Sequence, residues 1–162
     1  MRRVLPWTLL LAAGVVAADQ LTKWWAESAL VPGEATPVLG TVVQWRLIHN
    51  PGAAFGIAAG STWVLTVVAT AAVVGLAVFA TRVAAPGRAV AVGALLGGAT
   101  SHLGDRLLRE PGIARGHVVD FIDYNGWFVG NLADIALVGG AALLVLLTGP
   151  DDGEPRRGPA GA

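Results

Sequence analysis

The sequence predicts an all-α membrane protein in which four transmembrane helices carry a small extracytoplasmic β element and a loop. Its composition is 54% hydrophobic and only 14% charged, whereas an ordinary soluble domain carries about 25% charged residues. Its apolar segments approach the roughly 20 residues that a helix needs to cross the hydrocarbon core of a bilayer. The 22 glycines suit helices that pack closely inside a membrane. These observations argue against a soluble globular domain.

Charge and cysteine content exclude several function classes. Eleven Lys and Arg residues balance eleven Asp and Glu residues, so the chain offers no basic surface to nucleic acid. The sequence contains no cysteine, which removes disulfides, thiolate nucleophiles and thiolate metal sites. His49, His102 and His117 lack the spacing of a metal-binding motif. We therefore expect no nucleic-acid partner and neither a metal nor a cofactor.

The predicted spans bring ionisable residues to one side of the membrane. In chain order the spans are Val4–Trp25, Ser61–Thr81, Arg88–Leu108 and Gly130–Thr148. Because consecutive spans run in opposite directions, the first and third end where the second and fourth begin. This side receives a cluster of ionisable residues that consists of Asp19, Lys23, Asp105, Arg106 and Asp134.

The distribution of arginine orients the bundle. Arg2 and Arg3 precede the first span, and the short loop from Arg82 to Arg88 joins the second span to the third. Positive charge near the first helix and in short loops favours the cytoplasmic side. We therefore expect a multi-pass protein of the plasma (inner) membrane, with both termini in the cytoplasm and the ionisable cluster at the outer face.

The two ends of the chain invite separate predictions. The start also resembles a cleavable signal peptide that ends at Val16–Ala18, an alternative that we disfavour because it leaves the other three spans without a partner. The segment 150–162 is rich in Pro, Asp and Arg and is expected to be a disordered cytoplasmic tail. Residues 1–149 then form a single membrane domain.

The two outer loops differ in character. Within the segment Leu30–Gly60, the run Val38–Ile48 is rich in β-branched and aromatic residues, which predicts one or two short strands of a small sheet. The segment Arg109–Val129 contains one proline and several glycines and is expected to be an ordered loop that returns Asp120 to the membrane.

Ionisable residues in membrane spans are costly, so each is a candidate functional residue. Structural roles compete with that interpretation. Asp19 and Lys23 lie four residues apart, so they share one helix face and can form a simple ion pair. Asp105 and Arg106 can form a charge pair that extends toward water at the membrane surface.

A pair of carboxylates carries the most specific chemistry. Asp120 follows the apolar run Val118–Val119, and Asp134 opens the fourth span. Two carboxylates held close together in a low-dielectric site share a proton, so one acts as a base toward water and the other as an acid toward a carbonyl. Asp123 competes with Asp120 for this role, and Asp134 can instead cap its helix. A Ser101–Lys23 dyad is a weaker alternative.

Several ordered sequence blocks resemble those of signal peptidase II, the lipoprotein signal peptidase family. The resemblance covers nearly the whole chain. It rests on D-Q-L-T-K-W at Asp19–Trp24, N-P-G-A-A-F-G at Asn50–Gly56, G-G-A at Gly97–Ala99, D-R-L at Asp105–Leu107, V-V-D-F-I-D at Val118–Asp123 and N-L-A-D at Asn131–Asp134. The resemblance implies that Asp120 and Asp134 are the catalytic dyad of an aspartic endopeptidase.

The resemblance also implies a substrate and supporting roles. The substrate is a diacylglyceryl-modified prolipoprotein in the membrane, cut just before its lipid-modified cysteine. Asn50 and Asn131 would orient the substrate or the dyad. Further supporting or substrate-binding candidates are Asp19 and Lys23 on the first helix, Asp105 and Arg106 beside the loops, Gly52 and His102.

Two departures from the family pattern bear on activity. Where the family has G-N-x-x-D-R, this chain has Ser101 and His102 before Asp105 and Arg106, and Gly130 takes an aromatic position before Asn131. An imidazolium at position 102 would add charge beside the dyad. The glycine would remove a bulky wall of the site.

Other functions are expected if the departures at Ser101, His102 and Gly130 abolish catalysis. The chain would then be a catalytically impaired paralogue that still binds lipoproteins. A proton-coupled transporter subunit is a further alternative, because intramembrane Asp, His and Arg also mark proton pathways. In a transporter, however, such residues should be spread through the membrane depth. The expected partners are the prolipoprotein substrate and membrane lipid, and we expect the protein to be a monomer.

Overall fold

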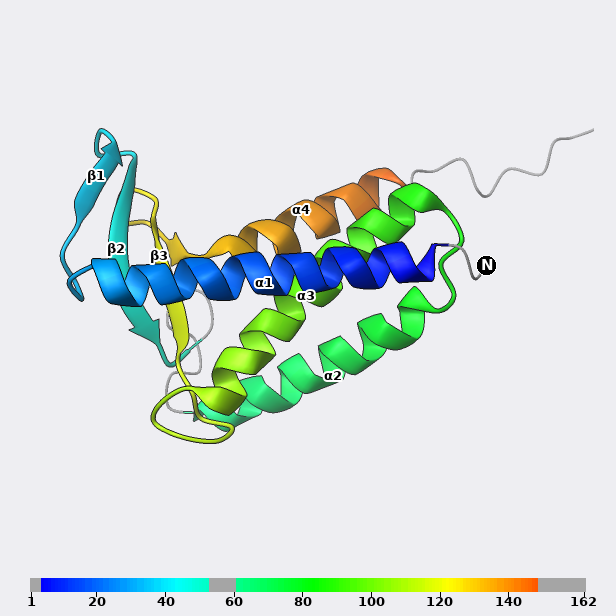
Figure 1. Cartoon of the computed structure of the whole chain (residues 1–162), viewed down its shortest axis with the longest axis horizontal. Coiled ribbons are helices and arrows are strands. Elements are labelled where there is room, and N and C mark those ends of the chain that lie inside the picture. Colours follow the sequence, from blue (N-terminus) through cyan, green and yellow to red (C-terminus); the bar gives the residue numbers. More distant parts are fainter. Residues whose placement is uncertain (1–3, 53–60, 149–162) are drawn as a thin grey trace, which may run out of the picture.

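The structure of the protein, a computed structural model, describes residues 4–52 and 61–148. Four helices form a bundle, and a small sheet covers one end of it (Figure 1). The helices are α1 (Leu5–Ala29), α2 (Thr62–Ala80), α3 (Pro86–Leu108) and α4 (Leu132–Leu146). The start of α1 and the end of α4 lie at the end away from the sheet (Figure 1). The predicted convergence of the helix ends is thus confirmed.

The number of helices is as predicted, but their lengths and compositions differ. Among the described residues, α1 and α2 are long and apolar enough to cross a membrane on their own. Helix α4 is apolar but has only 15 residues. Helix α3 is packed by all three other helices, so its small and charged residues contact protein rather than lipid. Arg2, Arg3, residues 53–56 of the N-P-G block and the tail 150–162 lie outside the described residues.

Glycines allow α3 to approach its neighbours closely. A Cβ atom at Gly97 would lie 2.7 Å from the carbonyl oxygen of Ala12 in α1. A Cβ atom at Gly98 would lie 2.8 Å from the carbonyl oxygen of Ala133 in α4. Side chains at either position would force the helices apart, so the G-G pair serves close packing of the bundle.

The sheet contains four antiparallel strands in the order β1-β2-β3-β4. They are β1 (Thr36–Leu39), β2 (Val43–Asn50), β3 (Val118–Asp123) and β4 (Val129–Gly130). Strands β1 and β2 confirm the prediction for Val38–Ile48. The prediction of a loop at Asp120 is wrong, because V-V-D-F-I-D is a strand in which every residue is buried. Burial on both faces removes the alternation that identifies a half-exposed strand.

Aromatic side chains attach the sheet to the bundle. Trp25 at the end of α1 makes edge contacts with Trp45 of β2 and Phe121 of β3, with ring centroids 5.4 and 6.2 Å apart. Leu47 and Val119 are buried in the same cluster. The sheet is therefore packed against α1, which fixes the position of β3 relative to the helices.

A buried lysine joins the helices to the sheet. Lys23 has no exposed surface, and its Nζ lies 2.6 Å from Asp19 Oδ2 and 2.6 Å from Asp105 Oδ2. The second oxygen of Asp19 accepts a hydrogen bond from the backbone N–H of Ala133 at 2.9 Å. Asp105 Oδ2 accepts one from the backbone N–H of Val119 at 3.4 Å. The lysine thus connects α1, α3, β3 and the first turn of α4.

Neighbouring side chains complete this network. Ser101 donates to Asp19 at 2.7 Å, and Gln20 donates to Ser101 Oγ and to Asp105, each at 2.9 Å. Arg109 Nε donates to Asp105 at 2.7 Å. The pairing of Asp19 with Lys23 is confirmed. Asp105, however, pairs with Lys23 and Arg109, so its predicted pairing with Arg106 is wrong.

Substitution of the buried lysine tests the network. Lys23→Met leaves two buried carboxylates without their shared cation, and breaking a buried ion pair typically costs about 3–5 kcal/mol. We expect a large fall in the thermal unfolding temperature of the protein in detergent. Leu21→Met, at a position that is 65% exposed, is the matched control and should unfold near the wild-type temperature. Equal unfolding temperatures for the two variants would contradict a structural role for the lysine.

Candidate active site

The two candidate carboxylates come from different elements, a strand of the sheet and the start of a helix, and both line one cavity. Asp120 lies on β3, where it pairs with Ile48 of β2. Asp134 lies in the first turn of α4, at position N3 of a capping box whose N-cap is Asn131. The Asn131 side chain accepts from the Asp134 N–H at 3.1 Å, and the Asp134 carboxylate accepts from the Asn131 N–H at 3.0 Å. Asn131 thus starts α4 and orients Asp134.

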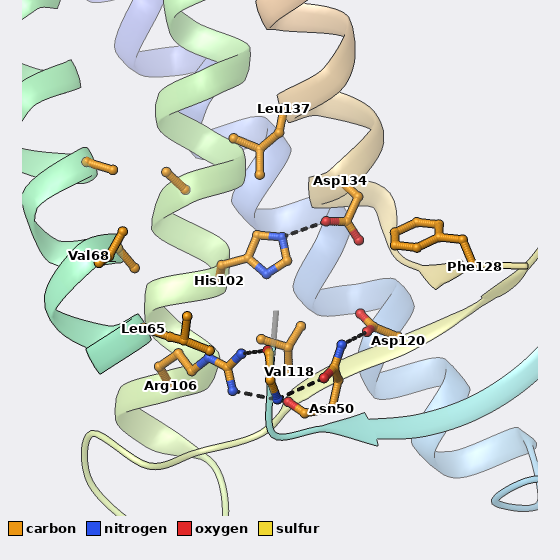
Figure 2. A pocket seen from close by; sticks show the side chains of 14 residues that line it. Asn50, Leu65, Val68, His102, Arg106, Val118, Asp120, Phe128, Asp134 and Leu137 are labelled. Carbon is orange, nitrogen blue, oxygen red and sulfur yellow. Dashed lines mark hydrogen bonds and ion pairs between the residues drawn. The ribbon is translucent and has the colours of Figure 1, made fainter. Parts of the chain in front are cut away.

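Asn131 also binds the other carboxylate. Its Nδ2 donates to Asp120 Oδ1 at 2.6 Å and to the carbonyl of Val119 at 3.3 Å. The second oxygen of Asp120 accepts from Asn50 Nδ2 at 3.0 Å (Figure 2). Asn131 therefore donates to both carboxylates, to Asp120 through its side chain and to Asp134 through its backbone N–H. Asn50 fixes the orientation of Asp120 from β2.

Burial controls the protonation of Asp120. The residue is 4% exposed, and loss of solvation raises the pKa of its carboxyl group to about 6. Hydrogen bonds from Asn50 and Asn131 lower this pKa, while the charge of Asp134 raises it and the charge of His102 lowers it. Because an ordinary aspartate has a pKa of about 3.9, Asp120 keeps a proton to much higher pH than an exposed carboxyl group.

Asp134 has a different environment. Its side chain is 26% exposed, and its Oδ1 lies 3.1 Å from His102 Nε2 on α3. Its Oδ2 accepts the Asn131 N–H, and the N-terminus of α4 carries partial positive charge. The Asp134 carboxylate is thus less buried than that of Asp120 and contacts both Asn131 and His102.

An apolar cavity of about 370 Å³ opens onto both acids. Its walls come mainly from small and aliphatic side chains of three helices, and Figure 2 shows Leu65, Val68 and Leu137 among them. The polar side chains that line it are Asn50, His102, Arg106, Asp120 and Asp134. This combination fits an extended or acylated ligand whose one polar bond must be placed beside the carboxylates.

Arg106 holds the chain segments that carry Asn50. Its guanidinium donates to the carbonyl oxygens of Asn50 and Gly116 at 3.1 and 3.0 Å, and also to those of Pro51 and Gly52. The residue is only 5% exposed. The prediction that Arg106 extends toward water is therefore wrong, because backbone carbonyl groups satisfy its charge inside the protein.

The wall expected to be missing at Gly130 is supplied by Phe128. A Cβ atom at Gly130 would lie 2.6 Å from the Phe128 ring and 2.8 Å from Asp134 Oδ2. The ring stacks on Tyr124 with centroids 6.1 Å apart, and it lines the cavity (Figure 2). The glycine thus makes room for an aromatic ring that arrives from two residues earlier.

The remaining predicted residues have structural positions. Asp123, the rival of Asp120, pairs with Arg46 at 3.1 Å and accepts from the Gly126 N–H at 2.6 Å. Gly52 donates its N–H to Asn50 Oδ1 at 2.9 Å. The contacts of Gln20 and Phe128 were not anticipated. Gln20 lies inside the first matched block, whereas nothing in the sequence pattern indicates the direction of the Phe128 ring.

The fold and the site define a class of protein. Two carboxylates differ in solvation, accept hydrogen bonds from the same asparagine and border an apolar cavity. This arrangement is the one expected of an aspartic peptidase. The helical bundle around them has the composition of a membrane protein.

Comparisons with known proteins identify the family. Residues 11–148 match the sequence model of signal peptidase (SPase) II, so the chain belongs to the signal peptidase II family. It is therefore a membrane-bound aspartic peptidase that removes signal peptides from prolipoproteins.

Individual relatives agree with this assignment. The lipoprotein signal peptidase of Mycobacterium avium is 49% identical over 86% of this chain and 77% of its own length. That of Mycolicibacterium smegmatis is 47% identical over 91% of this chain, which spans 63% of that longer relative. A solved bacterial membrane enzyme at 1.9 Å resolution matches with a TM-score of 0.77 and 29% identity, over 89% of this chain and 93% of its own.

The fit between Gly130 and Phe128 is testable. In Gly130→Ala the new methyl group displaces the Phe128 ring or the Asp134 carboxylate, and small displacements of reacting groups are expensive, up to about 100-fold in rate. We expect at least a tenfold lower rate of prolipoprotein cleavage by purified protein. Gly139→Ala, in α4 where a Cβ atom meets nothing within 4 Å, should retain activity. Full activity of Gly130→Ala would show that the ring position is unimportant.

Proposed function

We propose that Asp120 and Asp134 are the catalytic dyad and that the enzyme cleaves a prolipoprotein just before its diacylglyceryl-modified cysteine. The observation that carries the proposal is the position of Asn131, which hydrogen-bonds both carboxylates at the edge of the apolar cavity. Such an arrangement holds two acids in fixed geometry and in unequal environments, as shared-proton catalysis requires.

The unequal environments assign the first chemical step. Ionised Asp134 takes a proton from a water molecule, whose oxygen attacks the scissile carbonyl carbon. Protonated Asp120 gives its proton to the carbonyl oxygen, so a neutral gem-diol forms and no isolated oxyanion develops. After this step Asp134 is protonated and Asp120 is ionised.

The second step restores the starting state. Asp134 gives its proton to the amide nitrogen as the carbon–nitrogen bond breaks, and Asp120 recovers a proton from the gem-diol. The products are a carboxylic acid on the signal peptide and a free amine on the lipid-modified cysteine. The dyad ends with one proton on Asp120, ready for another water molecule.

The cavity supports a lipid-linked substrate. Side chains of α2, including Leu65 and Val68, form an apolar wall on one side, and Leu137 of α4 contributes to another (Figure 2). A peptide that carries two acyl chains can place apolar groups against these walls while its scissile bond lies beside Asp120 and Asp134. This placement supports cleavage next to the lipid anchor.

We also propose the membrane topology predicted by the sequence: four spans, cytoplasmic termini, one domain over residues 1–149, and an active site at the outer face. Trp24, Trp63 and Trp127 are 70%, 57% and 83% exposed and lie near the sheet end, as an interfacial aromatic belt would. The helices of one chain pack around α3 and supply all the described residues that line the cavity. We therefore propose that the protein is a monomer.

The contacts at the dyad favour an active enzyme over an impaired paralogue. Asn50 and Asn131 keep hydrogen bonds to Asp120, and the capping box keeps Asp134 in place. A proton-coupled transporter is disfavoured because the buried acids of the described helices, Asp19 and Asp105, belong to a closed network with Lys23 rather than to a path through the membrane.

Cleavage of a lipid-modified substrate tests the dyad. Purified protein in detergent should cut a diacylglyceryl-modified prolipoprotein immediately before the modified cysteine, as read by mass spectrometry. Asp120→Asn and Asp134→Asn should each lower the rate by at least about 1,000-fold, because each removes one half of the proton transfer. Asp123→Asn, in the neighbouring structural pair, is the matched control and should keep measurable cleavage. Substantial cleavage by either dyad variant would refute the assignment.

The pKa of Asp120 predicts the pH dependence of the reaction. The mechanism needs a protonated Asp120, and its pKa is about 6, so kcat/KM should fall about tenfold per pH unit above that value. Asn50→Ala removes a hydrogen bond that lowers this pKa, so the alkaline limb should move to higher pH. A kcat/KM that stays constant from pH 5 to pH 9 would contradict this assignment of the acid.

A further inference from the structure

The side chain of His102 contacts the dyad directly. It projects from α3, one helical turn before Arg106, and its Nε2 lies 3.1 Å from Asp134 Oδ1. The second ring nitrogen is turned away from Asp134 (Figure 2), and the side chain is 20% exposed. The proton in this contact can belong to either residue: an ionised Asp134 requires the proton on Nε2, whereas a protonated Asp134 would donate to a bare Nε2.

Charged side chains of both signs surround the imidazole of His102. Among the described residues that line the cavity, the charged neighbours of His102 are Asp134 from α4, Asp120 from β3 and Arg106 on its own helix. Helix α2 faces it with aliphatic side chains, and β2 contributes the neutral amide of Asn50. Two acids thus oppose one guanidinium, and that guanidinium is bound to backbone carbonyl groups.

We propose that His102 is a positioning residue that acts through Asp134: as an imidazolium, it holds Asp134 in the ionised form and directs the shared proton of the dyad to Asp120. This inference rests on the proposed function, because it assigns roles within that dyad. It makes the histidine a third ionisable member of the site, which contacts the base but takes no proton from the substrate.

The alternative role of His102 is a purely structural hydrogen bond to Asp134. The two roles differ in whether the charge of the side chain affects the reaction. A neutral amide at position 102 can donate to Asp134 without changing the electrostatic potential of the site. An imidazolium adds a positive charge beside both acids, and the charge of His102 lowers the pKa of Asp120. The pH range over which the enzyme works therefore depends on this side chain, whereas a structural hydrogen bond would leave that range unchanged.

Two substitutions distinguish the effect of the hydrogen-bond donor of His102 from the effect of its positive charge. His102→Asn keeps a donor but removes the charge, so the whole profile of kcat/KM against pH should move about half to one unit toward higher pH. His102→Leu removes the donor as well, and kcat should fall about 10- to 100-fold, the equivalent of one charged hydrogen bond, with little change in KM. Ser101→Gly, which alters the adjacent Asp19 network instead, should leave the position of the profile unchanged.

A spectroscopic measurement does not depend on turnover. Nitrogen NMR of imidazole-labelled protein in detergent should show one histidine that is doubly protonated at pH 7, and this signal should be missing in His102→Asn. In Asp134→Asn the same histidine should become neutral at pH 7. A neutral His102 in the wild-type protein, or pH profiles of wild type and His102→Asn that superimpose, would overturn the inference while leaving the dyad intact. Cleavage by Asp120→Asn or Asp134→Asn would instead refute the proposed assignment of the catalytic dyad.

Discussion

The burial of Lys23 between Asp19 and Asp105 is the constraint on which the rest of the structure depends. A lysine without solvent is tolerated only when acceptors surround it, and here the acceptors come from α1 and α3. These two carboxylates also accept the backbone N–H groups of Ala133 and Val119. Each of those residues directly precedes a catalytic candidate, Asp134 or Asp120. The buried ions therefore hold the backbone at the residues that precede both members of the proposed dyad.

The same fold makes the two acids unequal. Asp120 lies in a strand that is buried on both faces, and the loss of solvent favours its neutral form. Asp134 lies in the first turn of a helix, is partly exposed, accepts the Asn131 N–H and contacts His102 Nε2. In the proposed mechanism the acid and the base are identical side chains, and they differ because a buried strand and a helix N-terminus give their carboxyl groups different surroundings. Asn131 connects these environments, since it begins the helix and binds the acid of the strand.

Sequence reasoning recovered the features that depend on periodicity, charge and local motifs. It predicted four helices, the convergence of their ends, the strands around Trp45, and the pairing of Asp19 with Lys23. It missed features set by tertiary contacts. The sequence predicts a loop where β3 lies, because burial on both faces hides the periodicity of the strand. The surroundings of Arg106 and the ring of Phe128 were not predicted, because a side chain that binds distant carbonyl groups or fills the space above a glycine leaves no local pattern. The choice of Asp120 and Asp134 came from the residues and the family resemblance together and stays a prediction. The structure shows Asp120 and Asp134 lining one cavity and Asp123 paired with Arg46.

The central claim is that one proton resides on Asp120 while Asp134 is ionised. Infrared difference spectroscopy of the purified protein in detergent, titrated from pH 4 to pH 8, measures this directly through the carbonyl stretch of protonated carboxyl groups. A protonated-carboxyl band should disappear with a midpoint near pH 6, be missing in Asp120→Asn and persist in Asp134→Asn. A band that persists in Asp120→Asn and is lost in Asp134→Asn would reverse the roles of the two acids and contradict the account.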